Sequence, residues 1–104
     1  MIDKIEKDGE TEQDGFDAIE YPLDFAFKAV CETSSTASLD RLHEIINQAV
    51  ASIVGQLALK GASSKESRAG KYVSITTVAH VESRQQLEEI YGAISALDVV
   101  KMTL

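Results

Sequence analysis

Cysteine, proline and tryptophan are almost missing from this chain: its 104 residues include one cysteine, one proline and no tryptophan. With Cys31 alone, no disulfide can form within the chain, so the fold has to depend on a hydrophobic core. No apolar run approaches the roughly 20 residues that a membrane-spanning helix needs. The acidic N-terminus also lacks the apolar segment of a secretory signal. We therefore expect a cytoplasmic protein that makes no membrane contact.

Positive charge is also in short supply, since the formal net charge is −7. The excess of acids is concentrated in residues 1–20, which contain eight acids and two lysines. Residues 21–104 contain nine acids and eight bases and are close to neutral. These compositions predict an acidic, disordered tail over 1–20 and one folded domain over 21–104. A near-neutral domain lacks the basic field typical of nucleic-acid surfaces, so nucleic acid is not the partner that we expect first.

Apolar residues alternate with polar ones in some segments and follow a helical period of 3.6 residues in others. Alternation is strongest over 23–31 and 71–81, and the helical period begins at Leu39 and again at Gln85. Two shorter strands complete the pattern, at 56–60 and at 99–104, and the small polar residues of 61–70 predict a long hairpin loop.

The order of these elements is βαββαβ. A helix buries one stripe and a strand of this kind buries one face, so the simplest packing puts both helices on one face of the sheet. Right-handed crossovers then predict a ferredoxin-like two-layer α+β sandwich with a four-stranded antiparallel sheet in the order 4-1-3-2. We expect Ser38 to cap the first helix, Ser83 with Gln86 to form a capping box on the second, and Gly55 to end the first.

Three segments resemble a known family. They are the run YPLDFAFK at 21–28, the run SSK at 63–65 followed by GKYVSIT at 70–76, and the ending DVVKMTL at 98–104. In this order and spacing they resemble the YbeD-like family of small bacterial proteins. That resemblance implies a ferredoxin-like fold similar to ACT-type regulatory domains, an uncharacterised function and no catalytic residues to carry over. In this chain residues 66–69 separate the run SSK from the run GKYVSIT and lengthen the loop between them.

Residues with catalytic or metal-binding chemistry are few and scattered. Cys31 lies on the apolar face of its strand and is expected to be a small buried side chain. His43 is expected on a solvated flank of the first helix and His80 on the outward face of a strand. The three do not have the local spacing of metal ligands. We therefore expect no enzyme activity, no metal and no cofactor.

The first candidate site is a group of cations around the hairpin loop: Lys60, Lys65, Arg68 and Lys71. One interpretation is a mobile, solvated hairpin tip, and the other is a site for an anion or an acidic partner. A further hypothesis is that the acidic tail visits these cations in the same chain, an attraction that salt weakens at exposed sites.

The second candidate site is the sheet face that no helix covers. Ala26, Val30, Tyr72, Val78 and Val99 would make that face partly apolar, and Lys28 and His80 would also lie on it. One interpretation is a solvated sheet, and the other is an interface with a protein partner or with a second copy in a homodimer. Some ferredoxin-like proteins stack RNA bases on this face, for which Tyr72 is the aromatic residue available.

These observations favour a non-catalytic regulatory or adaptor domain, similar to ACT modules, that binds a protein partner or a small metabolite. The alternative is a nucleic-acid-binding module that uses the open sheet face and the basic 60–71 segment. The 32–38 loop contains no glycine, whereas ACT-type ligand loops often use one for close backbone approach.

Overall fold

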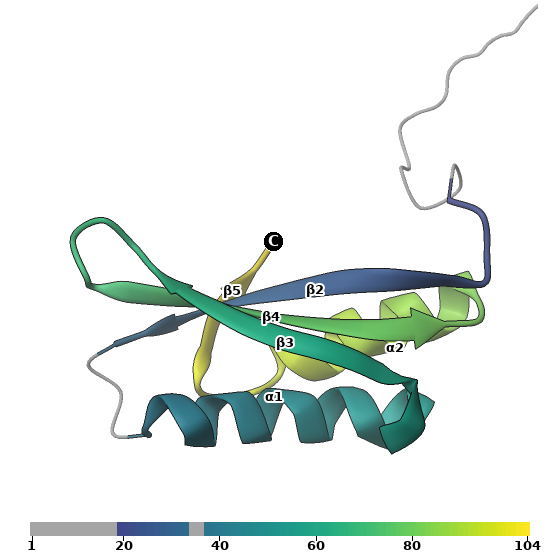
Figure 1. Cartoon of the computed structure of the whole chain (residues 1–104), viewed down its shortest axis with the longest axis horizontal. Coiled ribbons are helices and arrows are strands. Elements are labelled where there is room, and N and C mark those ends of the chain that lie inside the picture. Colours follow the sequence, from purple (N-terminus) through teal and green to yellow (C-terminus); the bar gives the residue numbers. More distant parts are fainter. Residues whose placement is uncertain (1–18, 34–36) are drawn as a thin grey trace, which may run out of the picture.

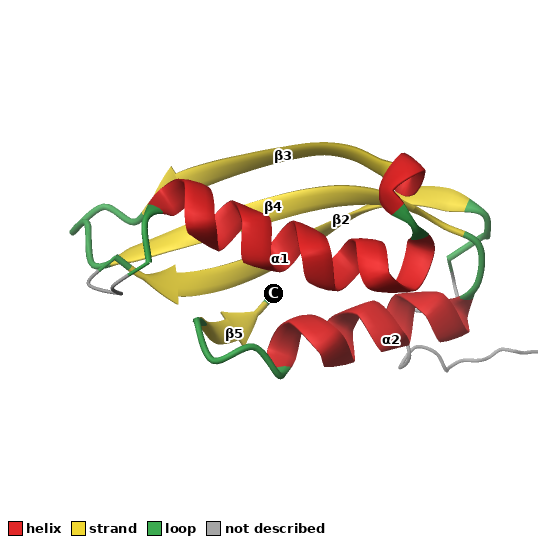
Figure 2. Cartoon of the chain, turned by 90° about the horizontal axis from the view of Figure 1, so that it is seen from below, coloured by secondary structure: helices red, strands yellow, loops and turns green. Residues whose placement is uncertain are grey.

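The computed structural model describes residues 19–33 and 37–104. The elements in these ranges are β2 (Leu23–Glu32), α1 (Leu39–Val54), the 3₁₀ helix η2 (Gln56–Ala58), β3 (Leu59–Glu66), β4 (Tyr72–Val81), α2 (Arg84–Ser95) and β5 (Val100–Thr103). The strands form one sheet in the order β3-β4-β2-β5, which is the predicted order read from the opposite edge. Both α-helices lie on one face of that sheet (Figures 1 and 2). The ferredoxin-like prediction is confirmed.

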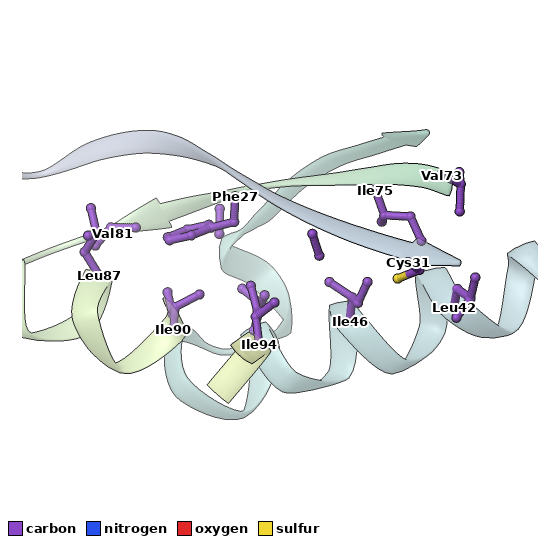
Figure 3. Close-up of a cluster of buried hydrophobic side chains, with 13 residues drawn as sticks. Phe27, Cys31, Leu42, Ile46, Val73, Ile75, Val81, Leu87, Ile90 and Ile94 are labelled. Atoms are coloured by element: carbon purple, nitrogen blue, oxygen red, sulfur yellow. The ribbon is translucent and has the colours of Figure 1, made fainter. Parts of the chain in front are cut away.

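The central pairing of the sheet joins β2 and β4 over the full length of both strands. The two run antiparallel from the pair Leu23↔Val81 to the pair Glu32↔Tyr72. The side chains on β4 alternate strictly between half-buried and buried, as expected for a sheet that is covered on one face. The buried set from both strands packs on α1 and α2, with Phe27, Ile75 and Val81 pointing towards the helices (Figure 3).

The helix ends follow the predicted capping chemistry. The Ser38 hydroxyl accepts a hydrogen bond from the Arg41 amide, and the Ser83 hydroxyl accepts one from the Gln86 amide. The Gln86 side chain in turn accepts from the amide of Glu82, one residue before the cap. Gly55 ends α1 at a positive φ of 91°, a conformation that glycine adopts without strain.

The second predicted strand is wrong in its bounds. Residues Gln56–Ala58 form the 3₁₀ helix, and Leu57, expected to point inward, is 96% exposed. The strand β3 then runs through most of the segment that was expected to be a loop, and only 67–71 turn the chain. The reason is the ladder with β4: it supplies backbone hydrogen bonds to small residues that have no apolar alternation of their own.

The last strand differs from the prediction through a bulge. Val30 pairs with Met102 and Cys31 pairs with Val100, so Lys101 is the extra residue between them. Val100 consequently packs on the core, while Met102 lies on the open face beside Val30. Val99, expected on the open face, instead packs against the core from the turn before β5.

Two predictions concern segments that lie partly outside the described ranges. Of the predicted acidic tail, residues 1–18 lie outside the described ranges. Ile19 and Glu20 are described, and Ile19 packs against the core. Of the loop after β2, residues 34–36 lie outside the described ranges. No helix in the described ranges combines the length and the apolar character needed to cross a bilayer.

Substitution of one buried and one exposed leucine tests the packing of the helices on the sheet. Leu87 has no exposed surface and Leu57 is almost fully exposed. We expect Leu87→Ala to lower the free energy of unfolding by about 2–5 kcal/mol, because it leaves a cavity between α2 and the sheet. Leu57→Ala should change it by less than about 0.5 kcal/mol. Urea unfolding followed by circular dichroism measures both, and equal losses would contradict the described core.

Candidate binding surface on the open sheet face

The open face of the sheet is lined by the outward side chains of β2 and β4. Directly opposite pairs are Asp24↔His80, Ala26↔Val78, Lys28↔Thr76, Val30↔Ser74 and Glu32↔Tyr72. The edge strands add Lys65 beside Ser74 and Met102 beside Val30. A row of side chains from Lys65 to Met102 therefore crosses all four strands of the sheet. The expected positions of Lys28, Val30, Tyr72, Val78 and His80 on this face agree with the register.

The hairpin between β3 and β4 is held at one end of this face and is not a free loop. The Thr33 hydroxyl lies 2.6 Å from the carbonyl oxygen of Gly70 and 3.0 Å from that of Lys71. The Thr33 amide also donates to the Lys71 carbonyl over 3.0 Å. These bonds tie the turn to the end of β2, so the backbone that carries the hairpin cations keeps a defined position.

The turn itself is closed by local hydrogen bonds. The Ser67 amide donates to the Tyr72 carbonyl, and the Ser67 hydroxyl accepts from the Tyr72 amide. The Gly70 amide donates to the Ser67 carbonyl, and Gly70 has a φ of 74°, in the left-handed region that favours glycine. A side chain at Gly70 would strain this turn.

Three cations, Lys65, Arg68 and Lys71, gather at this corner. Within the described residues, no ion pair involves Lys65, Arg68 or Lys71. The Lys71 ammonium lies 5.8 Å from the centre of the Tyr72 ring, a distance at which cation and ring attract each other. A hollow of about 540 Å³ opens here, lined by Lys65, Glu66, Ser67, Arg68 and Ser74. Its hydroxyls and cations suit a carboxylate or a phosphate.

Lys60 does not belong to this corner. It is the extra residue of a bulge between the pairs Leu59↔Ala79 and Gly61↔Val78, at the opposite end of β3. Four residues of extended strand, 61–64, lie between it and Lys65, so the two Cα atoms are roughly 16 Å apart. The four predicted cations are therefore arranged along an edge rather than in one loop, because 61–66 is a strand.

Charge is divided between the two layers of the domain. The strands and the hairpin of the sheet layer carry six bases and three acids, and the helices with their flanking turns carry two bases and six acids. The near-neutral composition of 21–104 therefore conceals a positive sheet layer on a negative helix layer. Such a division makes the electrostatic potential more positive at the sheet layer than at the helix layer.

The far end of the open face has the opposite character. The two ring nitrogens of His80 lie 2.9 Å from a carboxylate oxygen of Asp24 and 3.1 Å from one of Glu82. His80 is therefore held between acids and does not extend the positive surface. From Lys28 towards the hairpin the cations of the open face outnumber its acid, Glu32, which pairs with Lys101.

The hollows in the described region offer little to a small apolar ligand. One lined by Thr33, Ala37, Leu39, Leu42, Glu66 and Val73 measures about 120 Å³, which is below the ~300 Å³ at which ligand pockets begin. Another of about 330 Å³ is bordered by Glu32 and Lys101, whose charged groups lie 3.6 Å apart.

The thiol of Cys31 lies in the core, away from this surface. Cys31 has no exposed surface, and burial raises the pKa of its thiol. In the described ranges no group of three or more His, Cys, Asp or Glu side chains is placed to hold a metal ion.

Sequence reasoning missed two residues that matter here. Thr33 anchors the hairpin, and Met102 extends the apolar part of the open face. Neither carries a sequence signal, because Thr33 acts on a turn 37 residues away and Met102 reaches the face only through the bulge at Lys101.

Comparison with known proteins gives relatives across the folded domain. A family model described as "Protein of unknown function (DUF493)" matches residues 17–104. A "UPF0250 protein" of Shewanella sediminis is 36% identical over 83% of this chain and 90% of its own length. The "UPF0250 protein RSc0326" of Ralstonia nicotianae is 30% identical over 83% of this chain and 84% of its own.

A solved structure has the same fold. The solution structure of protein HP0495 from H. pylori superimposes with a TM-score of 0.59 at 20% identity. The match covers 93% of this chain and 98% of the other. At this identity the likeness concerns the fold alone.

Thiol reactivity tests the burial of Cys31. Because the thiolate is the reactive form and burial raises its pKa, we expect Cys31 to react with a disulfide reagent at pH 8 at least about a hundredfold more slowly than a free cysteine. In denaturant the rate should become that of the free amino acid. Rapid labelling of the folded protein would show that the strand face is open to solvent.

Proposed function

The chain belongs to the DUF493 or UPF0250 family, the YbeD-like small bacterial proteins, and on this premise we propose that it is a non-catalytic adaptor or regulatory domain that binds an acidic segment of a protein partner. The binding surface is the positive half of the open sheet face, from Lys28 to the hairpin. The ferredoxin-like architecture, which ACT-type regulatory domains share, supports such a role by analogy of fold.

The observation that carries this proposal is the set of cations on an anchored hairpin that form no ion pair with any described residue. Lys65 and Arg68 border one hollow and make no ion pair within the described residues. The Thr33 and Ser67 hydrogen bonds hold the turn on which they lie. Preorganised cations bind an anionic partner with a smaller loss of conformational entropy than mobile ones.

A protein segment fits this surface better than a metabolite does. The positive region extends over several strands, and the hollow at its corner is bordered by polar side chains, all exposed except the half-buried Ser74. Small molecules are usually enclosed by mostly apolar walls. An extended acidic segment can instead satisfy cations that are spread along a strand.

A labelled peptide of alternating glutamate and serine tests the proposal. We expect fluorescence anisotropy at low salt to show binding that weakens about fivefold in Lys65→Gln/Arg68→Gln, since each exposed charge pair contributes roughly 0.5 kcal/mol. The matched control, Arg41→Gln/Arg84→Gln, removes the same charge from the helix layer and should leave the affinity unchanged. A peptide of glutamine and serine should not bind. Equal weakening in both double variants would refute a specific surface on the sheet.

Nucleic acid is a second candidate ligand, favoured by Tyr72. Its ring lies on the open face beside the hairpin cations, with the Lys71 ammonium 5.8 Å from its centre. Aromatic residues of this kind stack on unpaired bases.

Under this second candidate we expect salt-dependent binding of single-stranded oligouridylate. Tyr72→Ala should weaken it at least about fivefold, whereas Tyr72→Phe should retain it, because stacking contributes roughly 1–3 kcal/mol per base. A filter-binding titration measures both variants. No retained RNA at low salt would eliminate this candidate.

A further inference from the structure

The strand β3 is an edge of the sheet and has a neighbour on one side only. All its residues from Lys60 to Glu66 are exposed, and its middle consists of small side chains: Gly61, Ala62, Ser63 and Ser64. An edge of this kind presents unpaired backbone groups to which another strand can bind.

The hydrogen-bond pattern shows which backbone groups point outward. The Leu104 amide donates to the Lys28 carbonyl, so the backbone groups of even-numbered β2 residues face β5 and those of odd-numbered ones face β4. By the same alternation, even-numbered residues of β4 face β3. This assignment agrees with the bond from the Ser67 amide to the Tyr72 carbonyl.

The register then places the groups of β3. Gly61, Ser63 and Lys65 are opposite Val78, Thr76 and Ser74, the three β4 residues whose backbone groups face β3. Their own amides and carbonyls are therefore used in the ladder. The amides and carbonyls of Ala62 and Ser64, between them, point away from the sheet.

Cations flank this free stretch. Lys60 lies at the bulge before it, and Lys65 and Arg68 follow it. Glu66 is the acid among them. An extended chain that bonds to Ala62 and Ser64 would pass within reach of these cations and would gain from carrying carboxylates.

We propose that the acidic segment of the partner binds as a fifth strand along β3. This inference rests on the proposed function and specifies how the acidic segment is held: the backbone groups of Ala62 and Ser64 bind its main chain, and Lys60, Lys65 and Arg68 bind its carboxylates. Main-chain bonds supply affinity for any extended segment, and the cations select acidic ones.

A second copy of this chain fits the edge less well. Each copy carries four cations and one acid along β3 and its turn, so two such edges repel each other through their net positive charge. An acidic segment from another protein meets no such repulsion.

Amide hydrogen exchange of the full chain with the glutamate–serine peptide is the first test. In the free protein, the Ser63 and Lys65 amides should exchange slowly and those of Ala62 and Ser64 quickly. Saturating peptide should slow exchange at Ala62 and Ser64 at least about tenfold, because they become hydrogen-bonded. If the peptide binds and these two amides keep their rates, the strand-addition proposal is wrong and the proposed acidic-partner surface stands.

Ala62→Pro provides a second test, because it removes an outward amide and leaves the ladder to β4 intact. We expect it to bind the peptide about fivefold more weakly, whereas Ala62→Ser, which keeps the amide, should bind like the original chain. Unchanged protection at Ser63 and Lys65 shows that the proline variant is folded. Equal affinities of the two variants would refute strand addition.

Two other outcomes separate this proposal from its premise. If no acidic peptide binds at low salt, the proposed function and this inference fail together. If exchange at Ala62 and Ser64 slows with rising protein concentration in the absence of peptide, a second copy occupies the edge and the proposed occupant is wrong.

Discussion

The antiparallel pairing of β2 with β4 is the constraint on which the rest of the domain depends. Ten residues of each strand are in register from one end of the sheet to the other. Because successive side chains point to opposite faces, this register decides at once which residues enter the core and which line the open face. A shift by one residue would bring Asp24, Lys28 and Glu32 against the helices, at a cost in desolvation that no partner there offsets.

The same register determines what the open face can bind. Lys28 lies near its middle, the acids around His80 lie at one end, and the hairpin cations lie at the other. The helices carry most of the remaining acids on the opposite layer. A domain close to neutral overall thus presents a strongly directional field, which influences both the approach and the orientation of a charged partner.

The sequence predicts the structure of a segment correctly where that segment has a hydrophobic pattern of its own. The alternation around Phe27 and Ile75 and the helical period around Ile46 were sufficient for the fold, since burial of one face imposes them. Residues 61–66 have no such pattern, because neither face of an edge strand needs to be apolar here. Their extended conformation depends on hydrogen bonds from β4, which residue types alone do not reveal.

Composition and periodicity alone determined the order of elements, the buried faces of β2, β4 and the two α-helices, and the acidic character of residues 1–20. The tertiary structure decided the relations between distant residues: the anchor from Thr33 to Gly70, the separation of Lys60 from Lys65, and the outward amides of Ala62 and Ser64. The physical reason is that burial preference belongs to each side chain and leaves a local period. Register, bulges and free strand edges belong to pairs of segments and exist only when both are in place.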